Sequence, residues 1–166
     1  GFYWYEDPYK DGGVSINGNK YLSKKLSTPI LVGEHVRNLE TSVDMLVKGA
    51  SFFSRADPDY DGGITGCHKL VVASEGLGMD CEIHSCGPAM RQLMGASRNS
   101  NFYEVNLLHP KCKNPWSLPI YLNGYSDQIN CIDVDGNVDV FNEPGLGVVY
   151  DWKFIEKQSL EKIIIK

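Results

Sequence analysis

Residues 51–63, SFFSRADPDYDGG, decide the fold of this chain, because they join a strand, a charged residue and a helix start in that order. The run SFFSRAD is typical of a β-strand, and Asp57 stands at its end. Gly62 and Gly63 then precede residues 64–78, whose grouped apolar side chains predict a helix. A strand that delivers one polar side chain and a helix that returns the chain make up one βα unit.

The same unit recurs on both sides of this stretch. Four further apolar or aromatic runs lie at residues 1–8 (GFYWYEDP), 28–35 (TPILVGEH), 80–85 (DCEIHS) and 101–107 (NFYEVNL). With Asp57, the polar residues at or just past the run ends are Glu6, Glu34, His84 and Glu104, at intervals of 28, 23, 27 and 20 residues. In a closed parallel barrel the C-terminal ends of all strands open onto one face, and that face carries the chemistry. Four acids and a histidine there predict a metal-assisted acid/base enzyme.

The segments between the runs support a parallel sheet with helices outside it. Helices are predicted at residues 15–27, 39–50, 64–78 and 88–98, the last starting at Pro88, a good first helical position. In the second of these segments, we expect Leu39, Val43, Leu46 and Val47 to share one apolar face.

The last third of the chain has a different pattern. Residues 118–150 include the alternating stretch INCIDVDGNVDVF, whose Asp135-Gly136 pair predicts a hairpin turn, and a final helix is expected at about 152–164. We therefore expect one domain over 1–166, with βα units to about 117 and a hairpin and helix over 118–166. A complete eightfold barrel needs about 250 residues, and Gly1 opens directly into a strand. We expect the chain to be the C-terminal part of a longer protein.

Composition excludes two classes of partner. The net charge of −5 and the lack of clustered basic residues argue against nucleic-acid binding. No run approaches the roughly 18 apolar residues of a membrane helix, and we expect no membrane partner. The five cysteines are odd in number and never spaced C-x-x-C, which predicts reduced thiols and a cytoplasmic protein: Cys67, Cys81, Cys86, Cys112 and Cys131.

Glu6 and Glu34 are the candidate metal ligands. Carboxylates at neighbouring strand ends suit a hard ion such as Mg²⁺, which prefers oxygen ligands. A single glutamate of this kind is more typical of a solvated loop acid, and it is the matching position on successive strands that favours a site. Two carboxylates hold Mg²⁺ poorly, so a third ligand is expected from a strand on the N-terminal side.

Asp57 and His84 are the candidate catalytic pair. A carboxylate that accepts a hydrogen bond from one imidazole nitrogen fixes the tautomer and leaves the other nitrogen available as a base. A lone histidine is more often structural, but the strand-end position of His84 favours catalysis. Glu104 is ambiguous, since in a buried strand its carboxyl group could stay protonated and donate a hydrogen bond to a developing oxyanion.

These residues stand in segments that resemble the mandelate racemase branch of the enolase superfamily. From strand four to strand eight, the matching segments are WYEDP (4–8), LVGEH (31–35), ADPDYDGGITG (56–66), EIHSCGP (82–88) and NFYEV (101–105), followed by PGLGVVYD (144–151). The resemblance implies the C-terminal part of a TIM-like (β/α)7β barrel of the α/β class, strands 4–8, plus a C-terminal hairpin segment. The family's capping domain and first three strands have no counterpart in the chain.

The resemblance also implies roles. Glu6 and Glu34 would bind Mg²⁺, His84 paired with Asp57 would be the general base, and Glu104 would bond the enolate formed by removal of a proton next to a carboxylate. The segment Glu34-His35 resembles the acid-sugar dehydratases most, in which the same histidine then assists loss of the β-hydroxyl group. A substrate contact and a surface role both stay open for His35.

The expected function is therefore a Mg²⁺-dependent dehydratase of an aldonic or aldaric acid, which as a full-length protein we expect to form a homo-oligomer. Two alternatives stay open: a racemase or epimerase of a 2-hydroxy acid that uses the same pair, and a non-catalytic barrel remnant or binding subunit.

Overall fold

The computed structural model describes residues 1–109, 111–114 and 119–165, and the chain divides into two compact units, Gly1–Glu104 and Val105–Lys166. The boundary predicted near residue 117 lies outside the described residues. The prediction of a single domain over 1–166 stays a prediction, and each unit is described by itself below.

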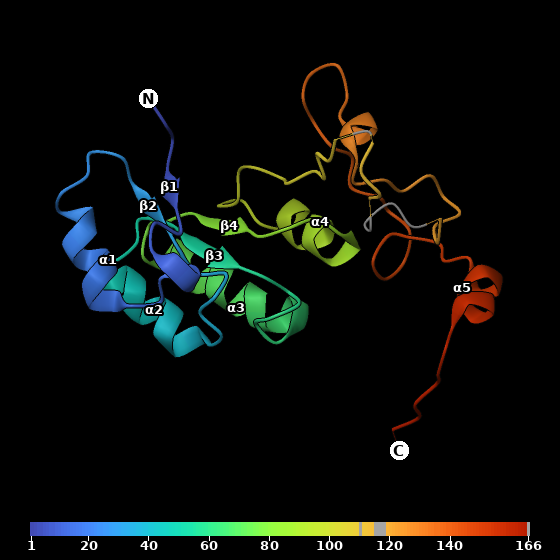
Figure 1. The fold of residues 1–166 in the computed structure, drawn as a ribbon, viewed down its shortest axis with the longest axis horizontal. Helices are drawn as coiled ribbons and strands as arrows, with labels where there is room; N and C mark the ends of the chain where they lie inside the picture. Colours follow the sequence, from blue (N-terminus) through green and yellow to red (C-terminus); the bar gives the residue numbers. More distant parts are fainter. Residues whose placement is uncertain (110, 115–118, 166) are drawn as a thin grey trace. The chain divides into compact units, whose positions relative to one another are not determined.

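Short parallel strands form the centre of the first unit: β1 (Tyr5–Glu6), β2 (Ile30–Leu31), β3 (Ser54–Ala56) and β4 (Cys81–Ile83). β1 pairs with β2, placing Glu6 opposite Leu31, and β3 pairs with β4, placing Arg55 opposite Glu82. A parallel bridge between Leu31 and Phe53 joins the two pairs. Four of the five predicted runs therefore lie side by side in chain order, as a parallel barrel requires (Figure 1).

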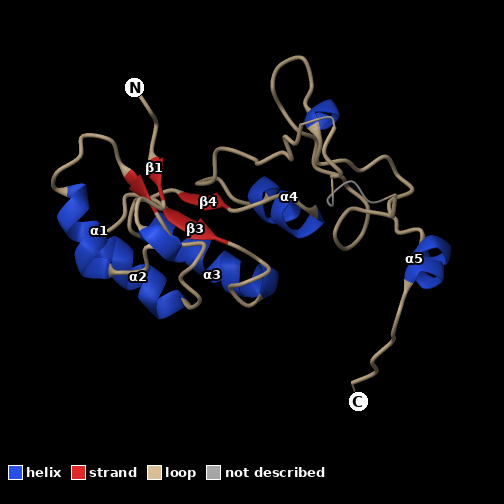
Figure 2. Ribbon diagram, in the orientation of Figure 1, coloured by secondary structure: helices blue, strands red, loops and turns tan. Residues whose placement is uncertain are grey.

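Three helices return the chain between these strands: α1 (Ile16–Ser23), α2 (Leu39–Val47) and α3 (Gly63–Gly76). Helix α4 (Pro88–Gly95) follows β4, and a 3-10 turn, η1 (Lys10–Gly12), precedes α1. Three of the four helix starts have a local cause. Ser15 accepts a hydrogen bond from Gly18 N, Asn38 Oδ1 accepts one from Thr41 N at 2.8 Å, and Pro88 opens α4. All four helices confirm the predicted segments, and Figure 2 shows them alternating with the strands.

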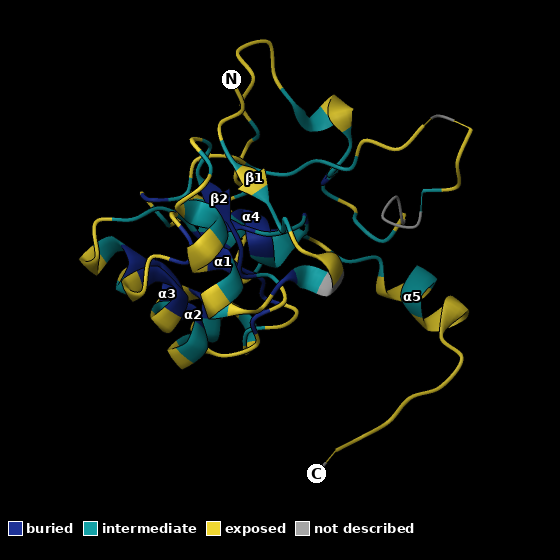
Figure 3. Cartoon of the chain, turned by 60° about the vertical axis from the view of Figure 1, so that its left-hand side comes forward, coloured by how far each residue is buried: buried dark blue, intermediate teal, exposed yellow. Residues whose placement is uncertain are grey.

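Two apolar clusters hold the helices against the strands. One joins β3 and β4 to α3 and α4 through buried residues that include Ala56, Leu70, Ile83 and Leu93. The other surrounds β2 and α2 and contains Ile30, Val32, Val36, Met45 and Ala50. Figure 3 shows the buried residues gathered around the strands and helices of this unit. Strands β2, β3 and β4 are buried under these helices, whereas Tyr5 of β1 is 48% exposed.

The fifth predicted strand is not formed: residues 101–109 have no strand assignment. The reason is the fully buried carboxylate of Glu82 on β4, which accepts hydrogen bonds from Asn101 N at 3.0 Å and Phe102 N at 3.2 Å. A side chain therefore takes the amide groups that a strand would give to a neighbouring backbone. The run still follows β4, and Cys81 N donates to Asn99 O at 2.7 Å.

The second unit is largely loop among its described residues, apart from a 3-10 turn, η2 (Ile129–Cys131), and α5 (Trp152–Gln158). The predicted turn at Asp135-Gly136 is present, since Asp133 N donates to Asn137 O and one antiparallel bridge joins Ile132 to Val138. The predicted hairpin strands are absent from the described residues, because the alternating side chains have no core to enter: Val134 is fully exposed. The last helix ends at Gln158, short of the predicted 164.

Within the described part of the chain, no helix has both the length and the apolar character that crossing a membrane requires.

Helix α2 offers a matched test of the core. Leu46 is 2% exposed, whereas its neighbour Val47, predicted on the same apolar face, is 63% exposed, so that part of the prediction is wrong. Leu46→Ala should lower the free energy of unfolding by about 2–5 kcal/mol through lost burial and a cavity. Val47→Ala should change it by less than about 0.5 kcal/mol. Urea denaturation measures both, and equal losses would contradict this placement of α2.

Candidate functional site

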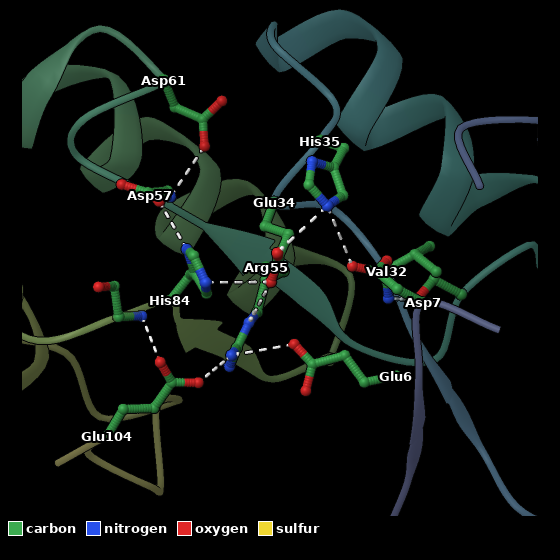
Figure 4. Close-up of polar contacts among 12 residues, drawn as sticks. Glu6, Asp7, Val32, Glu34, His35, Arg55, Asp57, Asp61, His84 and Glu104 are labelled. Atoms are coloured by element: carbon green, nitrogen blue, oxygen red, sulfur yellow. Dashed lines mark hydrogen bonds and ion pairs between the residues drawn. The ribbon is translucent and has the colours of Figure 1, made fainter. Parts of the chain in front are cut away.

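The strand ends bring the predicted site residues of the first unit together (Figure 4). Glu6 ends β1, Glu34 follows β2, Asp57 follows β3 and His84 follows β4. His84 N donates to Ala56 O at 2.8 Å, which ties the histidine backbone to the end of β3. Because the strands are parallel, these side chains share one end of the sheet.

Asp57 and His84 form a direct hydrogen bond. Asp57 Oδ2 lies 2.6 Å from His84 Nδ1, and Asp57 is only 2% exposed. The carboxylate is held in turn by the N–H of Asp59, which donates to Asp57 Oδ1 at 2.8 Å. A buried acceptor at Nδ1 favours a proton on Nδ1 and fixes the orientation of the ring.

Glu34 lies between two histidines. Its Oε2 is 3.2 Å from His84 Nε2, and its Oε1 is 3.3 Å from His35 Nε2. Gly33 makes this position possible: it has a φ of +153°, and a Cβ there would stand 2.7 Å from the backbone oxygen of Arg55. A side chain at residue 33 would push β2 away from β3 and separate Glu34 from His84.

Arg55 is a site residue that the sequence reasoning missed. It is 3% exposed on β3, and its Nη2 contacts Glu6 Oε1 at 3.0 Å and also Glu104 Oε1. Its Nε lies 3.7 Å from Glu34 Oε2. A signal was present, because Arg55 stands two residues before Asp57 and so faces the same side of the strand. Ser54 faces the other side, where its hydroxyl meets Ser74 of α3 at 2.7 Å.

Glu104 is brought to this cluster, but not as a buried acid. Its side chain is 39% exposed, and it accepts hydrogen bonds from Arg55 and from Ser85 N, the latter at 2.5 Å. The carboxyl group is therefore partly exposed, because the fifth run lies beside β4 without entering the sheet. The proposed role of Glu104 toward the enolate stays a prediction.

The charge around Glu6 fits a cation. Burial is the main cause that raises the pKa of Glu6, and the neighbouring carboxylates of Glu34 and Glu104 raise it further, while Arg55 lowers it. Crowded carboxylate oxygens that share one guanidinium suit a hard divalent ion, which would offset their repulsion. Glu6 and Glu34 therefore fit the Mg²⁺ predicted for them.

A second arrangement of ligand atoms lies beside the first. Single ligand atoms of Asp7, Glu34 and His35 all lie within 4.8 Å of one another, and Asp7 was not predicted. Burial and the nearby Glu34 carboxylate raise the pKa of Asp7, and its Oδ1 is buried without a hydrogen-bond partner. His35 is 42% exposed, with Nε2 3.6 Å from Asp7 Oδ2. Its predicted contact with substrate stays a prediction.

A family model described as enolase C-terminal domain-like matches residues 1–154. The chain belongs to this family. A search of curated protein sequences gave no significant match.

Solved structures of the same superfamily resemble the chain closely. D-glucarate dehydratase from Agrobacterium tumefaciens, complexed with magnesium, is 30% identical with a TM-score of 0.80, over 95% of this chain and 40% of that one. L-talarate dehydratase from Polaromonas sp. JS666, complexed with Mg and L-glucarate, is 21% identical with a TM-score of 0.68, over 93% of this chain and 39% of that one. A racemase from Streptomyces coelicolor A3(2) with bound magnesium is 19% identical with a TM-score of 0.74, over 94% of this chain and 39% of that one. The resemblance to the mandelate racemase branch is confirmed, and the chain spans about 40% of the length of these proteins.

Gly12 supports His35, and the claim has a matched control. Gly12 has a φ of +80°, and a Cβ there would stand 2.3 Å from His35 Cδ2, whereas Gly49, with a φ of +68°, has nothing within 4 Å of its Cβ position. Both alanine variants should lose about 1–2 kcal/mol of stability from the left-handed backbone. Gly12→Ala should lose more and shift the His35 ring resonances in ¹H–¹³C NMR spectra. Identical losses and unmoved His35 signals would refute the contact.

Proposed function

We propose that the protein carrying this chain is a Mg²⁺-dependent acid-sugar dehydratase that acts on an aldonic or aldaric acid. One observation carries the proposal: His84 is held at Nδ1 by the buried Asp57 and directs Nε2 at Glu34, 3.2 Å away. Because Glu34 is a proposed metal ligand, a substrate bound to that metal would lie close to His84 Nε2. The 30% identity to a glucarate dehydratase supports the acid-sugar class.

His84 would serve both proton transfers. Its Nε2 lone pair would remove the proton next to the substrate carboxylate, giving an enediolate and an imidazolium. Asp57, buried against Nδ1, would stabilise that imidazolium. The same proton would then pass from Nε2 to the β-hydroxyl group as the C–O bond breaks, so that water leaves and a 2-keto acid forms after tautomerisation.

Glu6 and Glu34 are the proposed ligands of Mg²⁺. When bound, the ion would supply Lewis-acid stabilisation for the substrate carboxylate as negative charge develops on it. Glu104, which contacts the same Arg55 nitrogen as Glu6, would form a hydrogen bond with an enolate oxygen. A cytoplasmic location and a homo-oligomeric state remain proposals, and the first rests on the odd number and the spacing of the five cysteines.

The test replaces the base in the intact protein that carries this chain. His84→Asn should abolish both dehydration and α-proton exchange, with a loss of at least about 10³-fold, because one residue serves two steps. Asp57→Asn should also be severe, since it disturbs the tautomer of His84. Incubation with acid sugars and MgCl₂ in D₂O, followed by NMR, reports exchange and 2-keto product together.

His68→Asn is the matched control, because His68 is exposed on α3 and should retain full activity. Near wild-type dehydration by His84→Asn would remove the histidine from the mechanism. Exchange without keto product in the wild type would favour the racemase alternative. Neither exchange nor product with any acid sugar tried would favour a non-catalytic barrel.

A further inference from the structure

Arg55 is the only residue among those described that the structure places in ion-pair contact with Glu6, Glu34 and Glu104 together. It reaches them from the middle of β3, where it is 3% exposed. The three carboxylates are 31%, 16% and 39% exposed, so the guanidinium lies deeper than the acids it contacts. Because Arg55 is buried, its guanidinium stays within the cluster whichever of the three acids it contacts.

The guanidinium holds the three acids unequally. Glu6 and Glu104 both lie on Nη2, Glu6 at 3.0 Å. Glu34 is 3.7 Å from Nε, too far for a hydrogen bond, and the buried Nε has no hydrogen-bond partner. A buried donor without an acceptor is unfavourable. The Nε–H of Arg55 and the carboxylate of Glu34 attract each other but do not form a hydrogen bond.

The charges do not balance either. One guanidinium faces three carboxylates, and the groups of this cluster carry a formal charge of −2 when all are ionised. Glu34 and Glu6 are also the two residues that fit a hard cation, so a metal ion and the guanidinium would share their oxygens. Two cations that close together repel each other strongly in a partly buried site.

We propose that Arg55 is a built-in counter-ion that holds Glu6, Glu34 and Glu104 together in the metal-free protein and limits the affinity of the site for Mg²⁺. On metal binding, the guanidinium gives up Glu34 and Glu6 and keeps Glu104. Arg55 is thus a positioning residue that acts through the carboxylates. This inference rests on the proposed function, because it takes Glu6 and Glu34 as ligands of Mg²⁺.

The test is Mg²⁺ calorimetry on the intact protein that carries this chain and on its variants. Arg55→Met removes the charge and should tighten Mg²⁺ binding roughly tenfold or more, because the competing cation is gone. The same variant should unfold at a lower temperature without Mg²⁺, and adding Mg²⁺ should restore more of its stability than it adds to the wild type. Arg55→Lys keeps the charge but loses the planar fork, and should bind Mg²⁺ within about threefold of the wild type.

Arg98→Met is the control for net charge, since Arg98 is 87% exposed and pairs with Glu75 outside the cluster. It should leave Mg²⁺ affinity unchanged. Unchanged or weaker binding by Arg55→Met overturns the inference while leaving the metal site intact. Absence of binding by both the wild type and Arg55→Met overturns the proposed metal site and the inference with it.

The wild type provides a second readout if Arg55→Met does not fold. The Nε–H of Arg55 gives its own signal in ¹H–¹⁵N spectra, which its loss from Arg55→Lys assigns. Mg²⁺ should shift this signal as Glu34 moves off the guanidinium. A signal that stays in place while calorimetry records Mg²⁺ binding would overturn the inference.

Discussion

Repulsion between carboxylates is the constraint on which the site of this protein depends. Parallel strands bring Glu6, Glu34 and Asp57 to one end of a sheet, and each acid loses water there. Such a cluster is unfavourable unless positive groups offset it. The chain supplies a buried guanidinium on β3 and an imidazole just after β4, and the contacts of both decide how the acids are arranged.

The two halves of the cluster differ in how completely they are satisfied. The half on β3 and β4 is closed: Asp57 has His84 and a backbone N–H as partners at hydrogen-bond distance. The half on β1 and β2 is open: Glu6 and Glu34 share Arg55, and Asp7 keeps a buried oxygen with no partner. The hydrogen-bonded Asp57–His84 pair suits a base that must keep one tautomer. The acids on the other side, which lack enough positively charged partners, suit a cation site.

The first four strands and the site residues at their ends could be predicted from the sequence, because each strand is an apolar run that a polar residue follows. The apolar runs that end at Glu6, Glu34, Asp57 and His84 are strands, and their parallel pairing brings those residues together. The fifth run has the same apolar pattern, but the partner of its amide groups is the side chain of Glu82, which no local pattern reveals. Arg55 was missed because an isolated charge in a strand usually faces water, and its burial depends on acids from three other segments.

The central claim is that Glu6 and Glu34 hold one divalent ion beside His84. The most direct measurement is a crystal structure of the intact protein that carries this chain, soaked in Mn²⁺, with the ion located by its anomalous scattering. The account predicts one strong peak within about 2.2 Å of oxygens from both Glu6 and Glu34, a distance close to that of Mg²⁺ ligands. A peak held by Asp7 and His35 without Glu6, or no peak while Glu6 stays on Arg55, would contradict it.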